Sequence, residues 1–152
     1  EWLNDIEATT VCHTSTLEIS PLLLKVEVEG VVYPTIMHAY QSLKEPDHER
    51  RREYSFVPLE VAVSMGRLPK IDIDQWDSRK HTVMESLMRL AYKQHPKIQT
   101  ILYDSGTSEI REDCVNDAQN FWGYVESIST SNVMGKLWMI IRDERFLRTS
   151  GF

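Results

Sequence analysis

Three polar side chains that could take part in chemistry are spaced along one predicted helix. His38, Gln41 and Lys44 fall at positions i, i+3 and i+6 of a segment that opens after Pro34, so they share one helix face. A lysine amine forms a Schiff base with a carbonyl carbon if its pKa is low enough to supply the free base. The alternative for Lys44 is an ordinary solvent-facing lysine near a helix C-terminus, where a positive charge is favourable.

Two tryptophans could present flat π faces to a nucleobase. Trp76 falls in the first turn of the longest predicted helix, where a tryptophan usually packs into the core. Trp122 lies in the run Phe121-Trp122-Gly123, where it could simply anchor a turn. Both interpretations stay open for each residue.

The other candidates are polar or charged residues that also have ordinary structural uses. Asp117 is the carboxylate best suited to acid–base chemistry, and Glu112 is the second candidate. Asp117 could instead cap a helix or turn. Asn132 could bond a ribose or a phosphate, or cap the last helix. Arg67 and Lys70 could bind phosphates, and ordinary surface charge is the alternative for both.

Composition argues against several other kinds of site. Cys12 and Cys114 form no CxxC pair and the five histidines are scattered, so we expect reduced thiols, no metal and no cofactor. A net charge of −6 argues against a duplex-binding surface. The basic run Arg50–Arg52 lies between glutamates, which is typical of a solvated helix face rather than an anion site. The apolar runs are far shorter than the roughly 20 residues of a membrane span, and we expect a cytoplasmic protein.

The chain pattern predicts one α+β domain over residues 1–152, mainly helical with a small antiparallel sheet. Residues 1–21 are interpreted as a loop or a short edge strand, and alternation around Gly30 predicts a hairpin. Helices are predicted to begin at Thr35 (as N-cap), Pro46, Leu59, Asp74 (as N-cap), Pro96 and Asn132 (as N-cap), with a short strand at Ile110. The side chains expected to point inward include Ile36, Tyr40 and Leu43 in the first of these helices, and Leu137, Ile140 and Ile141 in the last.

Five groups of residues occur in an order and spacing typical of one family. They are Val28–Thr35; His38, Gln41 and Lys44; Met65-Gly66-Arg67 with Trp76, Lys80 and Val83-Met84; Glu112, Asn116-Asp117 and Phe121–Gly123; and Asn132, Gly135, Met139 and Arg142. No single group is specific, but together they resemble the NADAR family of N-glycosidases over about residues 24–145.

This resemblance implies a compact, mainly helical α+β fold that acts on N-glycosidic bonds of ribosides. Family members are associated with riboflavin-pathway intermediates and with the removal of ADP-ribose from guanine in nucleic acid, and some are carried by bacteriophages. The resemblance further implies that Lys44 is the nucleophile, Asp117 the acid–base group, and Trp76 a residue that lines the site.

The sequence departs from the family pattern in three places. The family has a glutamate directly before the helix histidine, where this chain has Met37. The Phe-Ser-Asn-Phe-like stretch before the hairpin is absent. Two additional residues separate Asp117 from Trp122, so counting back from Trp122 places Gln119 at the acidic position.

The leading hypothesis is an N-glycosidase of ADP-ribose-like conjugates, ADP-ribosylated guanine in DNA among them. Lys44 and Asp117 would be catalytic, and the ligand-binding residues would be His38, Gln41, Arg67, Trp76, Trp122 and Asn132. Its expected partners are therefore an ADP-ribose-containing nucleotide or ADP-ribosylated nucleic acid, without a membrane or a metal. The two alternatives are a relative that binds such nucleotides without cleaving them, and an interaction module that uses only the fold.

Overall fold

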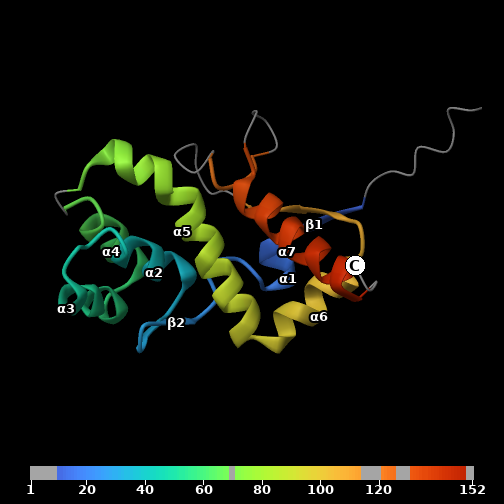
Figure 1. The fold of residues 1–152 in the computed structure, drawn as a ribbon, viewed down its shortest axis with the longest axis horizontal. Helices are drawn as coiled ribbons and strands as arrows, with labels where there is room; N and C mark the ends of the chain where they lie inside the picture. Colours follow the sequence, from blue (N-terminus) through green and yellow to red (C-terminus); the bar gives the residue numbers. More distant parts are fainter. Residues whose placement is uncertain (1–9, 69–70, 114–120, 126–130, 150–152) are drawn as a thin grey trace, which may run out of the picture. The chain divides into compact units, whose positions relative to one another are not determined.

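The computed structural model describes residues 10–68, 71–113, 121–125 and 131–149, and these divide into two compact units. One unit is formed by Ser20–Ile98, and the other combines the chain up to Ile19 with Gln99 onwards. Helices predominate in the described residues (Figure 1), and the mainly helical α+β class predicted from the sequence is confirmed.

The unit formed by Ser20–Ile98 opens with the predicted hairpin. Strands β2 (Val26–Val28) and β3 (Val31–Tyr33) pair antiparallel, with Val28 opposite Val31. The two residues between them, Glu29 and Gly30, both have positive φ, as the commonest two-residue hairpin turn requires.

Helix α2 (Ile36–Ser42) is the central helix of this unit. It begins where predicted, since the Thr35 side chain accepts a hydrogen bond from the His38 backbone N–H. All seven of its residues are buried, because it packs against α4, α5, the 3-10 helix η1 and both hairpin strands. The helix ends at Ser42, so Lys44 lies in the turn beyond it and not on the predicted helical stripe.

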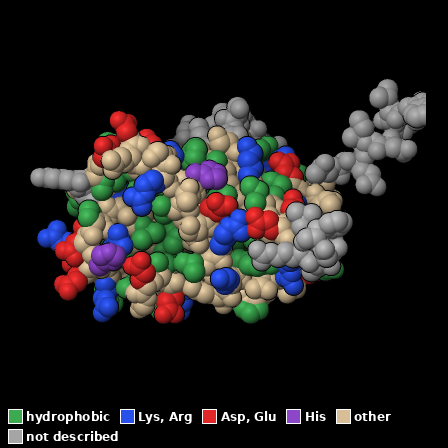
Figure 2. Space-filling model, in the orientation of Figure 1, with side chains coloured by type: hydrophobic (Ala, Val, Ile, Leu, Met, Phe, Trp, Pro, Cys, Tyr) green, Lys and Arg blue, Asp and Glu red, His purple; other side chains and the backbone are tan. Residues whose placement is uncertain are grey.

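Three short helices follow α2: α3 (His48–Arg51), η1 (Arg52–Phe56) and α4 (Leu59–Met65). Asp47 caps α3 by accepting the backbone N–H groups of Glu49 and Arg50. Arg50 and Arg52 are exposed, and acidic and basic side chains are mixed over the surface around α3 (Figure 2). The two outer arginines of the basic run therefore belong to a solvated face, whereas Arg51 is largely buried.

Helix α5 (Ile73–Gln94) is the longest helix and buries Met84, Leu87, Met88 and Ala91. Its N-cap is Asp72 and not the predicted Asp74, because the Asp72 carboxylate accepts the backbone N–H groups of Asp74 and Gln75. This cap places Trp76 in the first turn of α5, as predicted. About two helical turns separate Trp76 from Met84, the first buried residue of the helix.

Helix α6 (Pro96–Asp104) follows at once and begins with Pro96 in its first turn, as predicted.

The other unit contains a parallel strand pair that local patterns did not predict. Strands β1 (Val11–His13) and β4 (Glu109–Arg111) pair in parallel, although they are about a hundred residues apart in the chain. The one-turn helix α1 (Thr14–Leu17) follows β1 directly. The strand predicted at Ile110 is confirmed. Within the described residues the strands form two separate pairs, an antiparallel one in the hairpin and the parallel pair of β1 and β4.

Helix α7 (Val133–Thr149) packs against β4 in this unit. A Cβ at Gly135 would lie 2.1 Å from the Ile110 backbone oxygen, which explains a glycine at this point of closest approach. Leu137 and Ile141 are buried as predicted, but Ile140 is 45% exposed, because the buried stripe follows positions 134, 137, 138 and 141.

No helix in the described part of the chain is both long enough and apolar enough to cross a membrane.

Candidate functional site

Lys44 lies in the turn that follows α2 and is half-buried. Its backbone N–H donates to the Gln41 carbonyl oxygen, 3.2 Å away, which holds the turn against the end of the helix. The amine therefore projects from a short, hydrogen-bonded segment rather than from a solvent-exposed helix face.

Two aromatic rings lie beside the Lys44 amine. The Tyr40 and Trp76 rings meet edge to face with centroids 5.4 Å apart, and Trp76 Nε1 donates to the Tyr40 hydroxyl at 3.2 Å. Lys44 Nζ lies 5.3 Å from the Tyr40 centroid and 5.7 Å from that of Trp76. At these distances the amine lies beside both rings. The sequence predicted Tyr40 only as a core residue, and its spacing of four residues from Lys44 is the signal that could have identified it.

The surroundings of Lys44 favour the neutral amine. Burial lowers the pKa of Lys44 from its ordinary value, and the nearby positive charge of Arg67 lowers it further. The Asp77 carboxylate acts in the opposite direction and raises the Lys44 pKa. Burial raises the pKa of Tyr40 to about 12, so this phenol stays protonated where the lysine begins to lose its proton.

Neutralising the two charges that act on Lys44 should move its pKa in opposite directions. Arg67→Gln removes a cation that disfavours the ammonium form, so the Lys44 pKa should rise. Asp77→Asn removes a carboxylate that favours the ammonium form, so the pKa should fall. A pH titration of the Lys44 side-chain NMR signals measures both shifts. The matched control is Arg89→Gln, because Arg89 pairs with Glu85 within α5. If Arg67→Gln shifts the Lys44 pKa no more than this control does, Arg67 is not a cause of the lowered pKa.

A cavity of about 300 Å³ opens beside Lys44. The turn after α2 and the start of α3 supply one wall, which includes Leu43, Lys44 and Arg51. The first two turns of α5 supply the facing wall, which includes Trp76 and Arg79. The nucleophile candidate and the stacking candidate thus line the same cavity, as an active site needs.

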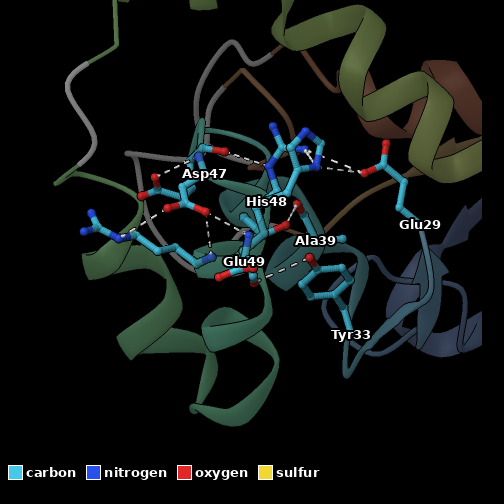
Figure 3. A network of polar contacts seen from close by, with 10 residues as sticks. Glu29, Tyr33, Ala39, Asp47, His48 and Glu49 are labelled. Atoms are coloured by element: carbon cyan, nitrogen blue, oxygen red, sulfur yellow. Dashed lines mark hydrogen bonds and ion pairs between the residues drawn. The ribbon is translucent and has the colours of Figure 1, made fainter.

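A second cavity, of about 500 Å³, lies between the hairpin and α3 and shares Leu43 and Arg51 with the first. Glu29 points from the hairpin turn towards His48 (Figure 3), and their side chains are 3.4 Å apart. Arg51 contacts both of these residues, since its NH1 lies 3.3 Å from His48 Nδ1 and 3.8 Å from Glu29 Oε2. The Nε of Arg51 also donates a hydrogen bond to the Glu45 carbonyl oxygen at 2.7 Å. These contacts hold the Arg51 guanidinium in place.

Gln41 is buried near Lys44 and has an unsatisfied acceptor. Its Oε1 has no hydrogen-bond partner among the described residues, and a Cβ at Gly66 would lie only 2.1 Å from that oxygen. A buried amide oxygen without a partner carries a desolvation cost, which a ligand N–H or O–H would relieve. The predicted ligand-binding role of Gln41 stays a prediction, and the close approach gives a physical reason for glycine at position 66.

Both ring nitrogens of His38 lie within hydrogen-bond distance of other residues in the fold. Nδ1 lies 2.8 Å from Thr35 Oγ1, and Nε2 lies 2.9 Å from the Val57 carbonyl oxygen. Because a carbonyl can only accept, Nε2 donates to the Val57 oxygen. His38 therefore links the start of α2 to the segment before α4, while its predicted contact with a ligand stays untested.

Trp122 and Asn132 belong to the other unit, where both have structural contacts. The Trp122 ring meets Phe121 edge to face at 4.6 Å, and its carbonyl oxygen accepts from the Met134 N–H. The Asn132 side chain accepts from the Glu112 N–H and donates to the Ile110 oxygen, so it connects β4 to the start of α7. It does so from a positive φ of 48°, a conformation that asparagine tolerates well.

The structure describes only one of the two carboxylate candidates, Glu112. Glu112 is buried and accepts a hydrogen bond from the Thr14 hydroxyl. Asp117, the alternative Gln119 and the phosphate candidate Lys70 lie outside the described residues. Across the ranges that are described, no cluster of three histidine, cysteine or acidic side chains could hold a metal ion.

Comparison with known proteins shows the family. The sequence model of the NADAR domain matches residues 4–145, which extends the resemblance some twenty residues towards the N-terminus. Proteins named N-glycosidase YbiA from Escherichia coli (strain K12) and Shigella boydii serotype 4 (strain Sb227) are 30% identical over 122 residues, covering 78% of this chain and 74% of each relative. The NMR structure of the E. coli protein YbiA matches with a TM-score of 0.78 at 23% identity, over 99% of this chain and 93% of that one, and so shares its fold. The chain therefore belongs to the NADAR family, as the order of its motifs predicted.

Proposed function

We propose that this protein is an N-glycosidase that hydrolyses the ribosidic C–N bond of ADP-ribose-like conjugates, ADP-ribosylated guanine in DNA among them. Membership of the NADAR family and relatives named N-glycosidase support the class of reaction. The observation that carries the proposal is the half-buried Lys44 amine, which lies beside the Tyr40 and Trp76 rings at the wall of a cavity. Burial and the nearby Arg67 lower the Lys44 pKa, which favours the free amine that a nucleophile requires.

The proposed reaction proceeds through a Schiff base. Opening of the ribose ring breaks the C1′–O4′ bond, and O4′ takes a proton. Lys44 Nζ then adds to C1′, and the base leaves with the electrons of its C–N bond and a proton, so that Nζ and C1′ form a Schiff base. Water adds to C1′, the C1′–Nζ bond breaks, and the released sugar closes again. One water is consumed for each C–N bond cleaved, and no oxidant or reductant is needed.

The remaining site residues have supporting roles in this proposal. Trp76 would stack on the base or nucleotide beside Lys44, which fits its place in the cavity wall. Asp117 would exchange protons with the leaving base and the attacking water. Trp122 would stack in the same way as Trp76.

The direct test is to incubate the protein with ADP-ribosylated DNA and, separately, with NAD, and to measure released ADP-ribose. Release from the DNA, with restoration of unmodified guanine, is the expected result. Intact substrate after prolonged incubation with protein at stoichiometric concentration would contradict the proposal.

A second candidate function is nucleotide binding without cleavage, and Met37 is the residue that favours it. Methionine cannot exchange a proton and brings no charge to the reacting sugar, whereas the family pattern has a glutamate there. The two functions separate in one comparison, because a binder raises its melting temperature with ADP-ribose by mass action yet releases nothing from ADP-ribosylated DNA.

A further inference from the structure

The beginning of α5 forms one wall of the cavity beside Lys44, although most of its side chains are exposed. This wall includes the N-cap residue and three residues of the first two turns: Asp72, Gln75, Trp76 and Arg79. Every residue from 72 to 79 is exposed except Trp76, which is partly shielded, and the buried residues of α5 begin at Met84. A helix end with few buried contacts opens locally at a low cost in free energy. The shape of the cavity therefore depends on what holds this end of α5.

Trp76 connects this end of α5 to the buried helix α2 through Tyr40. Its indole Nε1 donates to the Tyr40 hydroxyl at 3.2 Å, and the two rings meet at an angle of 63° with centroids 5.4 Å apart. Tyr40 is only 4% exposed and lies on a helix whose seven residues are all buried, so its hydroxyl oxygen is held in place by the packed core. An edge-to-face contact and a hydrogen bond to the same partner restrict both the position and the rotation of the indole.

Tyr40 can influence a ligand in this cavity only through its neighbours. Among the described residues, Lys44 and Trp76 line the cavity and Tyr40 does not. Removing the Tyr40 hydroxyl would deprive the indole N–H of its acceptor while the two rings stay in contact. Because an indole has a single hydrogen-bond donor, this one bond is its whole polar attachment to α2.

We infer that Tyr40 is a positioning residue of this site, whose hydroxyl anchors the Trp76 indole, and with it the first two turns of α5, in the arrangement that forms the cavity wall. The effect on a substrate rests on the proposed function, whereas the anchoring of α5 stands on the geometry alone. Tyr40 thus determines how tightly a ligand is held against the Trp76 ring and not how fast the bond beside Lys44 is broken.

Amide hydrogen exchange tests the anchor without any ligand. Tyr40→Phe keeps the ring and removes only the hydroxyl, so the amides of residues 76–79 should exchange about fivefold faster, the factor expected for one neutral hydrogen bond. Residues 84–94 should exchange as in the wild type. The matched control is Tyr54→Phe, because Tyr54 is also buried and its hydroxyl donates to the Met65 carbonyl oxygen at 3.2 Å. This control should leave the exchange of residues 76–79 unchanged.

Calorimetry with ADP-ribose tests the consequence for binding. Tyr40→Phe should raise the Kd about fivefold, while the single-turnover rate of cleavage at saturating substrate should stay within about twofold of the wild type. Trp76→Phe lacks the indole N–H, so adding Tyr40→Phe to that variant should change the Kd by less than about twofold, since the bond it removes is already absent. An equal effect of Tyr40→Phe with and without the indole would show that the hydroxyl does not act through Trp76, and would overturn the inference.

Failure of this inference can be told apart from failure of the proposed function. Equal exchange of residues 76–79 in wild type and Tyr40→Phe, or faster exchange spread evenly over α5, removes the anchor whether or not the protein cleaves its substrate. A protein with faster exchange in Tyr40→Phe that releases no ADP-ribose contradicts the N-glycosidase activity and keeps the anchor. A protein that cleaves its substrate, with the same Kd for wild type and Tyr40→Phe, retains its activity and contradicts the positioning role.

Discussion

Lys44→Ala should lower the rate of C–N cleavage by about 10³-fold or more, because it removes the proposed nucleophile. Binding of ADP-ribose should survive in part, since Trp76 and Arg79 in the cavity wall are unchanged. Single-turnover cleavage of ADP-ribosylated DNA measures the first effect, and calorimetry with ADP-ribose measures the second.

Lys44→Arg is the matched control for this substitution. It keeps a cation within reach of the Tyr40 and Trp76 rings, but a guanidinium stays protonated and cannot form the Schiff base. It should therefore be as inactive as Lys44→Ala while it binds ligand more tightly. Cleavage by Lys44→Arg at near the wild-type rate would mean that Lys44 acts as a charge and not as a nucleophile.

Met37→Glu should destabilise the protein by roughly 3 kcal/mol or more without increasing cleavage. Met37 is only 8% exposed and lies on α2, where every side chain is buried, so a glutamate there must lose its hydration. Chemical denaturation measures the loss of stability, and cleavage is then compared under conditions where both proteins are folded.

Two further variants separate charge from shape at this position. Met37→Leu conserves volume and should cost less than about 1.5 kcal/mol. Met37→Gln has nearly the shape of glutamate without its charge, so it should leave cleavage unchanged. A folded Met37→Glu protein that cleaves about 10²-fold faster than wild type, while Met37→Gln does not, would favour the binding-only function for the natural sequence.

Features set by neighbouring residues could be predicted from the sequence. The hairpin follows from alternation on both sides of Glu29-Gly30, and the start of α2 from a threonine that can accept an N–H three residues on. The cap of α5 shows the limit of such local signals. Asp72 and Asp74 both suit an N-cap by residue type, and only the geometry assigns the position to Asp72.

Features set by residues distant in the chain could not be predicted. The parallel pairing of Val11–His13 with Glu109–Arg111 leaves no mark on either short segment. In the candidate site, the family resemblance supports Lys44 and Trp76, whereas the sequence predicts Tyr40 only as a core residue and does not single out Arg79. Their place beside Lys44 depends on how α2 and α5 pack, which spacing along one helix does not reveal.

Borohydride trapping tests the central claim most directly, because it reports the bond that Lys44 is proposed to form. The protein is mixed with ADP-ribosylated DNA, reduced during turnover, digested and analysed by mass spectrometry. The expected result is a reduced sugar adduct on the peptide that contains Lys44, present in the wild type and absent from Lys44→Arg. Efficient release of ADP-ribose with no adduct on Lys44, or with an adduct on another lysine, would contradict the account.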